Sequence, residues 1–318
     1  MQANKRELYF DFLRGIAIIF VIGIHANAHY FQEAQTITNF TTNLFSCAVP
    51  IFLAISAYFI AKKRSATTFE EYKVSLKKQI IKIYIPCLLL QLPLYCSSVY
   101  NGIPILNCTI VWILGGFGIY YFPILIIQYY ILFPLLNKNC NKLWQTVYII
   151  ISLASTTLVN CNHNMLMNLT PMPYVVTIGT FPIWICFFSL GIYLSKNEQK
   201  DILGPTLVLI TTLLVRLVFG IKIGYNVIGF IYSYSIILIL FSNRIKRMYK
   251  SNNFTNAIAW LGLYSYTAYL IHDYFIRLID KDSFILRWGL ATIATAFVIY
   301  MLKRILPNTI LRYLGIYS

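Results

Sequence analysis

The first long apolar segment of the chain carries four ionisable side chains whose types and spacing could support chemistry. Arg14 and His25 lie eleven positions apart, and the stretch from Ile16 to Ile24 between them has no charge. At about 100° and 1.5 Å per residue, a helix places both on one face, roughly 16 Å apart along its axis. Asp11 lies one turn before Arg14, and His29 lies one turn after His25. Ionisable groups in a membrane segment usually face the protein interior or a wet cavity, so this polar stripe indicates function.

His25 is the strongest candidate for a reacting group. The unperturbed pKa of histidine, about 6.5, suits a general base. The sequence has no GxSxG, Walker or HExxH motif, and its seven cysteines form no CxxC pair. We therefore expect neither a metal site nor a disulfide framework.

A second polar group occurs near the C-terminus, in the segment WLGLYSYTAYLIHDYFIRL (260–278). Ser265, Tyr269 and His272 share one face of a helix, and Asp273 and Arg277 are spaced to form an ion pair. The spacing of His272 fits a reagent and a helix-packing residue equally well. Elsewhere, Lys82 fits either a snorkelling side chain or an anion contact, and Ser56 either a helix-packing bond or a site residue. The rings of Tyr120 and Tyr121 fit either an interfacial belt or a platform on which a carbohydrate stacks.

The composition shows what kind of element must position these residues. Of the 318 residues, 58% are hydrophobic and only 11% are charged, and the mean hydropathy is +0.67. The fold class expected is an all-α integral membrane protein, a bundle of about ten transmembrane helices. The predicted spans are 10–30, 42–61, 79–100, 118–137, 144–160, 174–195, 202–219, 225–242, 257–278 and 285–306.

The distribution of positive charge predicts the topology. With the N-terminus in the cytoplasm, 19 of the 26 Lys and Arg residues fall in cytoplasmic segments, and only Lys222 and Lys281 fall in outer loops. This bias predicts that both termini are cytoplasmic. It also explains the net charge of +16 without a nucleic-acid partner. The basic segment 62–78 fits either a linker held by anionic membrane lipids or an entrance for an anionic ligand.

The arrangement of these residues resembles the membrane acyltransferase 3 family. The resemblance rests on the R-x10-H pattern of Arg14 and His25 in DFLRGIAIIFVIGIH, and on VPIFLAISAYF, KKQIIKIYIP, YYFPILIIQYYILFPLL and LGLYSYTAYLIH in the same order. Two positions depart from the family pattern. An Arg-x-x-Arg pair is replaced by Gln79 and Lys82, and a small Gly is replaced by Ala57. Lys cannot form the bidentate contact of Arg, which weakens the expected anion binding there.

The resemblance implies a single transmembrane domain over residues 1–318 that acts as an O-acyltransferase in the plasma membrane. It implies transfer of an acyl group, usually acetyl, from cytoplasmic acyl-CoA (acetyl-CoA) to a hydroxyl of a surface glycan or lipid-linked sugar. No bound cofactor is expected. Association with polysaccharide biosynthesis proteins is expected. His25 would be catalytic, as a base or as a transient acyl carrier, and Arg14, Lys78 and Lys82 would bind the donor. The residues expected to hold or position the acceptor are Asp11, His29, Ser56, Ser265, Tyr269 and His272.

Two other classes of function fit the same composition. One is a transporter or flippase of a lipid-linked glycan or acyl group. The other is a structural subunit of a polysaccharide synthase, in which the polar stripe only holds helices together. A transporter leaves its substrate chemically unchanged, and a structural subunit tolerates His25→Gln, so a covalent product that depends on His25 distinguishes the three.

Overall fold

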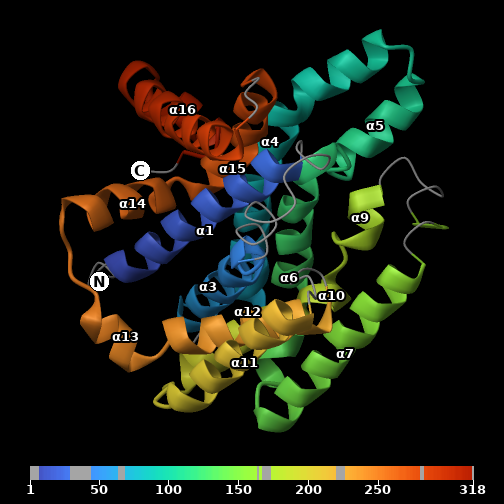
Figure 1. The fold of residues 1–318 in the computed structure, drawn as a ribbon. Coiled ribbons are helices and arrows are strands. Elements are labelled where there is room, and N and C mark those ends of the chain that lie inside the picture. Colours follow the sequence, from blue (N-terminus) through green and yellow to red (C-terminus); the bar gives the residue numbers. More distant parts are fainter. Residues whose placement is uncertain are drawn as a thin grey trace. The chain divides into compact units, whose positions relative to one another are not determined.

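The structure is a computed structural model, and it describes residues 7–28, 44–63, 69–162, 165–166, 173–219, 226–279 and 283–316. The regular secondary structure of these residues is helical, with no strand among them (Figure 1). The helices are α1 (Leu8–Ala28), α3 (Ala48–Lys63), α4 (Phe69–Tyr100), α5 (Ile105–Ile113), η1 (Gly118–Tyr120), α6 (Tyr121–Lys138), α7 (Lys142–Cys161), α9 (Pro173–Thr177), α10 (Phe181–Lys196), α11 (Leu203–Phe219), α12 (Val227–Leu240), α13 (Asn243–Met248), α14 (Asn253–Leu263), α15 (Ser265–Leu278), α16 (Phe284–Ile305) and α17 (Asn308–Tyr313).

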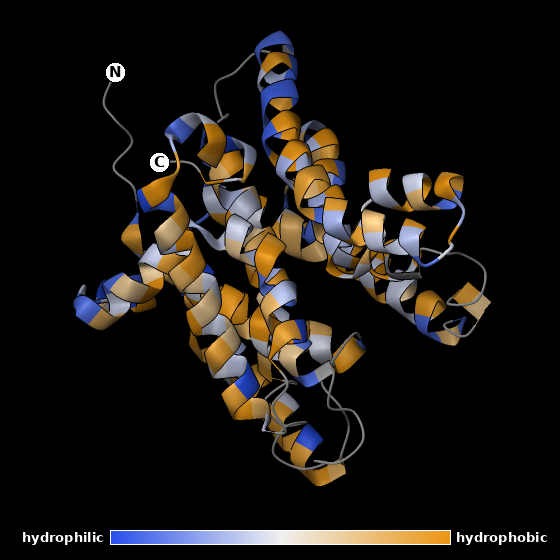
Figure 2. Cartoon of the chain, turned by 90° about the horizontal axis from the view of Figure 1, so that it is seen from above, coloured by the Kyte–Doolittle hydropathy of each residue, from blue (hydrophilic) through white to orange (hydrophobic). Residues whose placement is uncertain are grey.

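Five of the described helical segments are long and apolar enough to cross a membrane. They are Leu8–Asn27, Glu70–Tyr100, Gly118–Lys138, Lys142–Cys161 and Phe284–Ile305. Three shorter apolar helices, α10, α11 and α12, fall below that length. Hydrophobic residues cover most of the length of the helices (Figure 2). The all-helical fold is therefore confirmed, with five helices that are candidates to span a membrane, while the count of ten spans and the orientation of the termini stay predictions.

The chain forms two compact units, which are described separately. The first comprises Met1–Ser56 and Lys196–Met301, and the second comprises Ala57–Ser195 and Leu302–Ser318. In the first unit, α1 packs against α14 and α15, and α11 packs against α12. In the second unit, α4 packs against α5, α6 and the short C-terminal α17.

Three predicted spans differ from the observed helices. The third begins at Phe69, ten residues early, because Glu70 and Glu71 favour the first turn of a helix and Glu70 pairs with Lys73 at 2.8 Å. The sixth is divided between α9 and α10. There the Gln128 side chain donates to the Gly179 carbonyl (2.9 Å) and accepts from the Phe181 amide (3.0 Å). The ninth is divided at Tyr264 into α14 and α15.

The aromatic residues at the start of α6 are part of the interior of the second unit. Tyr120 and Tyr121 are only 1% and 5% exposed, and the Tyr120 hydroxyl donates to the Leu90 carbonyl at 3.2 Å. A ring on which a sugar stacks must have a free face. Their burial favours a packing role for these two rings, and the carbohydrate platform stays a prediction.

Candidate functional site

Two glycines set the distance between α1 and α14 in the first unit. A Cβ added to Gly15 would overlap the Ile258 carbonyl oxygen, and one added to Gly262 would overlap the Asp11 carbonyl oxygen. The two backbones therefore touch, as they do where small residues line a membrane helix interface. Figure 1 shows α1 and α14 side by side. This contact fixes the first half of α1, which carries Asp11 and Arg14.

Further along, α1 meets α15, and two histidines come together. The imidazole rings of His25 and His272 lie with their centroids 5.2 Å apart and their planes tilted by 44°. Gly262 lies against Asp11 and Gly15, and His272, ten residues later, lies against His25. From Gly262 onward, α15 therefore runs in the same direction as α1.

His272 is fully buried and is held by its own helix. Its Nδ1 lies 2.6 Å from the Tyr269 carbonyl oxygen and 3.2 Å from that of Ala268. Its Nε2 is buried and has no hydrogen-bond partner within the part of the chain that the structure describes. His25 differs from it, because part of its side chain is exposed. The pair thus consists of one enclosed and one accessible imidazole.

The predicted neighbours of His272 on α15 are buried with it. Ser265 is 7% exposed and Tyr269 is 5% exposed, and the ring of Tyr269 lies 5.7 Å from that of His272. The predicted ion pair is also present, since Arg277 Nε donates to Asp273 Oδ2 at 2.8 Å. The face of α15 that was expected from the spacing is therefore buried, as is most of the rest of this helix.

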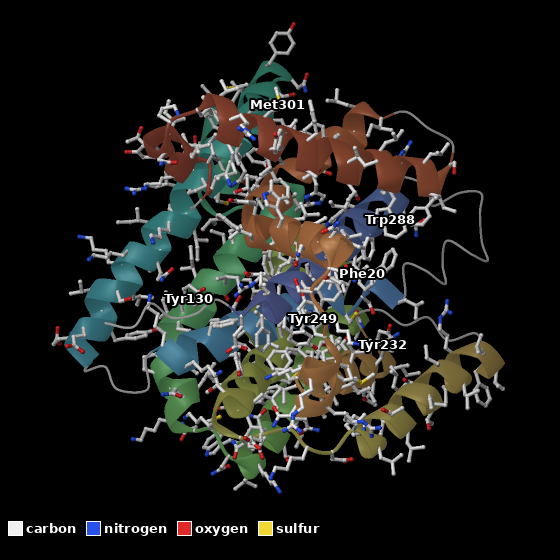
Figure 3. All side chains as sticks on the ribbon, turned by 90° about the vertical axis from the view of Figure 1, so that its left-hand side faces the viewer. Phe20, Tyr130, Tyr232, Tyr249, Trp288 and Met301 are labelled. Carbon is white, nitrogen blue, oxygen red and sulfur yellow. The ribbon has the colours of Figure 1, made fainter. Side chains whose placement is uncertain are left out.

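Aromatic rings from two other segments pack against the second half of α1. Phe45 stacks on Phe20 with centroids 4.4 Å apart, and its ring lies 5.0 Å from that of Trp288 on α16. Phe20 and Trp288 are labelled in Figure 3. The Trp288 indole N–H donates to the Ile19 carbonyl at 2.8 Å. A Cβ at Gly23 would overlap the Phe45 ring. These contacts hold α1 just before His25.

Arg14 has a counter-ion on its own helix. Its Nη1 donates to Asp11 Oδ1 at 3.0 Å. The side chain of Asp11 is 4% exposed and that of Arg14 is 25% exposed. The two charges compensate each other, so Arg14 offers directed N–H donors within a nearly neutral pair.

Lys78 and Lys82 belong to the second unit, where both are exposed on α4, one turn apart. Lys82 lines a cavity of about 280 Å³ between α4 and α17, together with Arg312 and Thr309. The remaining walls are Ile81, Ile85, Pro86 and Tyr313. Two cations and a hydroxyl over apolar walls can hold a phosphate group attached to an apolar or flexible chain.

The remaining predicted residues lie apart from these clusters or outside the described residues. Ser56 is half-buried on α3, and no hydrogen bond of its hydroxyl to a group of the site is shown. His29 lies outside the described residues. Within those residues, no three His, Cys, Asp or Glu side chains gather as metal ligands do.

Four residues with a part in these clusters were not predicted. Gly15 and Gly262 set the approach of α1 and α14, Trp288 anchors α1, and Arg312 adds a second cation beside Lys82. Gly262 precedes a Leu-Tyr-Ser sequence inside an apolar segment, and this was the available signal for a close approach and a break. The sequence gives no comparable signal for Trp288 or Arg312.

Comparison with known proteins gives one match. No curated protein and no solved structure matches the chain significantly. The family model described as an acyltransferase domain, Acyl_transf_3, matches residues 7–303. This range runs from the start of α1 nearly to the end of α16 and includes both histidines of the pair. The chain therefore belongs to the acyltransferase 3 family and is a membrane acyltransferase.

Proposed function

We propose that the protein is an O-acetyltransferase of the plasma membrane. It transfers an acetyl group from cytoplasmic acetyl-CoA to a hydroxyl of a surface glycan or of its lipid-linked precursor. The observation that carries this proposal is the accessible imidazole of His25, held against a buried His272 in a chain that belongs to an acyltransferase family.

The chemistry that His25 supplies is acid–base or nucleophilic. As a base, it takes the proton of the acceptor hydroxyl while the oxygen attacks the thioester carbonyl. The C–S bond then breaks, and the thiolate of coenzyme A receives a proton. As a nucleophile, its lone pair attacks the carbonyl first, and the C–S bond breaks to release coenzyme A as the thiolate. The acceptor oxygen then attacks the acyl-imidazole, the C–N bond breaks, and the hydroxyl proton passes to the freed imidazole or to the thiolate. Both routes require one imidazole nitrogen with a free lone pair.

Cationic side chains are proposed to bind the donor. The phosphates of the donor are anionic, and Arg14, Lys78 and Lys82 supply N–H donors to them. The cavity beside Lys82 adds Arg312, which gives two positive charges where the family pattern's second arginine is a lysine. Within the first unit, the Ser265 and Tyr269 hydroxyls lie on the same helix face as His272, and they are the groups proposed to hold the acceptor.

The test is acyl transfer by the purified protein in lipid, with labelled acetyl-CoA and a membrane glycan extract. We expect label in the glycan with the wild-type protein and at least about 100-fold less with His25→Ala, because a positioned base contributes about 10²- to 10⁴-fold. Donor binding should be unchanged in His25→Ala. Near wild-type transfer by that variant would remove His25 from the chemistry.

Other results of the same assay separate the remaining functions. Transport of an unmodified glycan or acyl group without a covalent product would identify a transporter. Release of coenzyme A without acceptor, together with a trapped acyl-protein, would identify the covalent route. Release that depends strictly on acceptor would identify direct transfer.

A further inference from the structure

The hydrogen bonds of His272 determine which of its nitrogens carries the proton. Nδ1 faces the carbonyl oxygens of Tyr269 and Ala268 at 2.6 and 3.2 Å. A carbonyl oxygen only accepts, so Nδ1 must be the N–H donor. In a neutral imidazole the other nitrogen, Nε2, then carries a lone pair. The backbone of α15 therefore selects one tautomer of His272.

The lone pair of His272 Nε2 lies in the interior without a donor from the part of the chain that the structure describes. A buried polar atom without a partner is costly, and such atoms are rare in proteins. A titratable ring on another element, that of His25, lies with its centroid 5.2 Å away. An N–H···N bond of about 2.9 Å between two imidazoles, each with a radius of roughly 1.1 Å, separates the centroids by about 5 Å. The observed centroid separation matches this value, but the structure contains no hydrogen bond between the two rings, so forming it requires a ring to turn.

We propose that His272 is a positioning residue, whose Nε2 accepts an N–H from His25 in the working enzyme. This bond fixes the tautomer and the orientation of His25. The second nitrogen of His25 then presents its lone pair to the reacting group. The catalytic consequence of this inference rests on the proposed function. The hydrogen bond between His25 and His272 is independent of that function.

The role follows from the difference in burial between the two rings. His272 has no exposed surface, whereas His25 is partly exposed. His272 therefore acts on His25 and not on a substrate. When His25 takes the proton of the acceptor hydroxyl, it becomes an imidazolium that still donates to His272. The proton then moves to the departing thiolate of coenzyme A, and His272 stays neutral throughout. This is the arrangement in which a third group orients a base.

Two amide variants separate this role from a purely structural one. His272→Gln places an amide oxygen near the position of Nε2 and so keeps the acceptor. His272→Asn places its amide nitrogen near Nδ1, and so keeps the backbone hydrogen bond and loses the acceptor. We expect kcat within about 5-fold of wild type for His272→Gln and at least about 100-fold lower for His272→Asn. The KM for acetyl-CoA should be unchanged in both. A residue that only stabilises α15 would give the opposite ranking, and that ranking would overturn the proposal.

A second measurement tests the hydrogen bond without any substrate. Solid-state NMR of the protein in lipid, with ¹⁵N-labelled histidine, reports the protonation and hydrogen bonding of each ring nitrogen. The His272→Gln variant assigns the His272 signals. We expect a protonated Nδ1 and a hydrogen-bonded Nε2 that shifts toward its free value in His25→Phe. An Nε2 signal that does not respond to His25→Phe would overturn the proposal, even if acyl transfer is intact.

The two measurements also distinguish this inference from the proposed function. If the wild-type protein transfers no acyl group but Nε2 responds to His25→Phe, the O-acetyltransferase proposal fails and the histidine hydrogen bond stands. If transfer occurs and His272→Asn is as active as His272→Gln, the O-acetyltransferase proposal stands and the positioning role of His272 fails.

Discussion

Arg14 lies in an apolar helix together with its own counter-ion. Asp11 is buried to 3% exposure, and its carboxylate accepts from Arg14 at 3.0 Å. A buried carboxylate that loses its partner is strongly destabilising. Loss of activity after replacement of Arg14 would therefore have two causes, namely a weaker donor contact and an uncompensated Asp11. These causes can be separated because Asp11 can be neutralised independently.

We predict that Arg14→Gln lowers the free energy of unfolding by about 2 kcal/mol and raises the KM for acetyl-CoA about tenfold. The double variant Asp11→Asn/Arg14→Gln should recover most of the stability, because the buried carboxylate is gone, but should keep the raised KM. Thermal unfolding in detergent and steady-state kinetics measure the two effects. A double variant with a normal KM would show that Arg14 supports the helix and does not contact the donor.

The sequence shows relations within one helix much better than relations between helices. The ion pair of Asp273 and Arg277 follows from their spacing of four residues, and the structure contains it at 2.8 Å. The pair of His25 and His272 could not be predicted, because their contact depends on how α1 and α15 pack. Arg312 was counted only as a cytoplasmic charge, since nothing in its neighbourhood indicates that α17 packs on α4 beside Lys82.

At the scale of the elements, the contact between α1 and α14 depends on the absence of two side chains. Added Cβ atoms at Gly15 and Gly262 would meet backbone atoms, which cannot move aside as a side chain can. On α16, a Cβ at Gly289 would meet nothing within 4 Å. The chain therefore contains a matched control for a glycine-to-alanine exchange in a helix.

We predict that Gly262→Ala lowers the free energy of unfolding by about 3 kcal/mol, because α14 must move away from α1. It should also reduce transfer, since the same helix pair sets the position of His25. Gly289→Ala should be neutral or stabilising by about 0.5 kcal/mol, because alanine favours a helix. Thermal unfolding and the transfer assay of both variants check this. Equal stability of the two variants would refute the close backbone contact.

The predicted spans show where periodicity is sufficient and where it is not. Long apolar runs such as that of α6 were found because an 18- to 20-residue apolar segment has few alternatives to a helix. The breaks at Tyr264 and between α9 and α10 were missed, because apolar residues continue on both sides of each break. The Gln128 side chain that bridges the second break lies on α6, about fifty residues earlier in the chain.

At the scale of the whole molecule, the topology is the prediction with the widest consequences. Odd-numbered spans should run outward, and the shared direction of α1 and α15 agrees with this for the first and ninth. The assignment places the 101–117 segment outside and the segment around Lys142 inside. Asn101 and Lys142 are both exposed in the structure, so both suit chemical labelling.

We predict that a cysteine at Asn101 reacts with a membrane-impermeant maleimide in intact cells, and that one at Lys142 reacts only after permeabilisation. The background should replace Cys96, Cys140 and Cys161 with serine, because these three native cysteines are not buried. Labelling of the Lys142→Cys variant from outside would overturn the ten-span topology with a cytoplasmic N-terminus.

The contact between Gly15 and Gly262 joins two points near opposite ends of the chain. A ribosome delivers α1 early and α14 only after the whole of residues 57–195 has been synthesised. During most of synthesis, α1 therefore lies in the bilayer before the helix that packs against it has been made. The ion pair of Asp11 and Arg14 keeps α1 nearly neutral in the bilayer during this time. Substitutions at Gly262 should consequently spare the insertion of the nascent chain and affect only its last step of assembly.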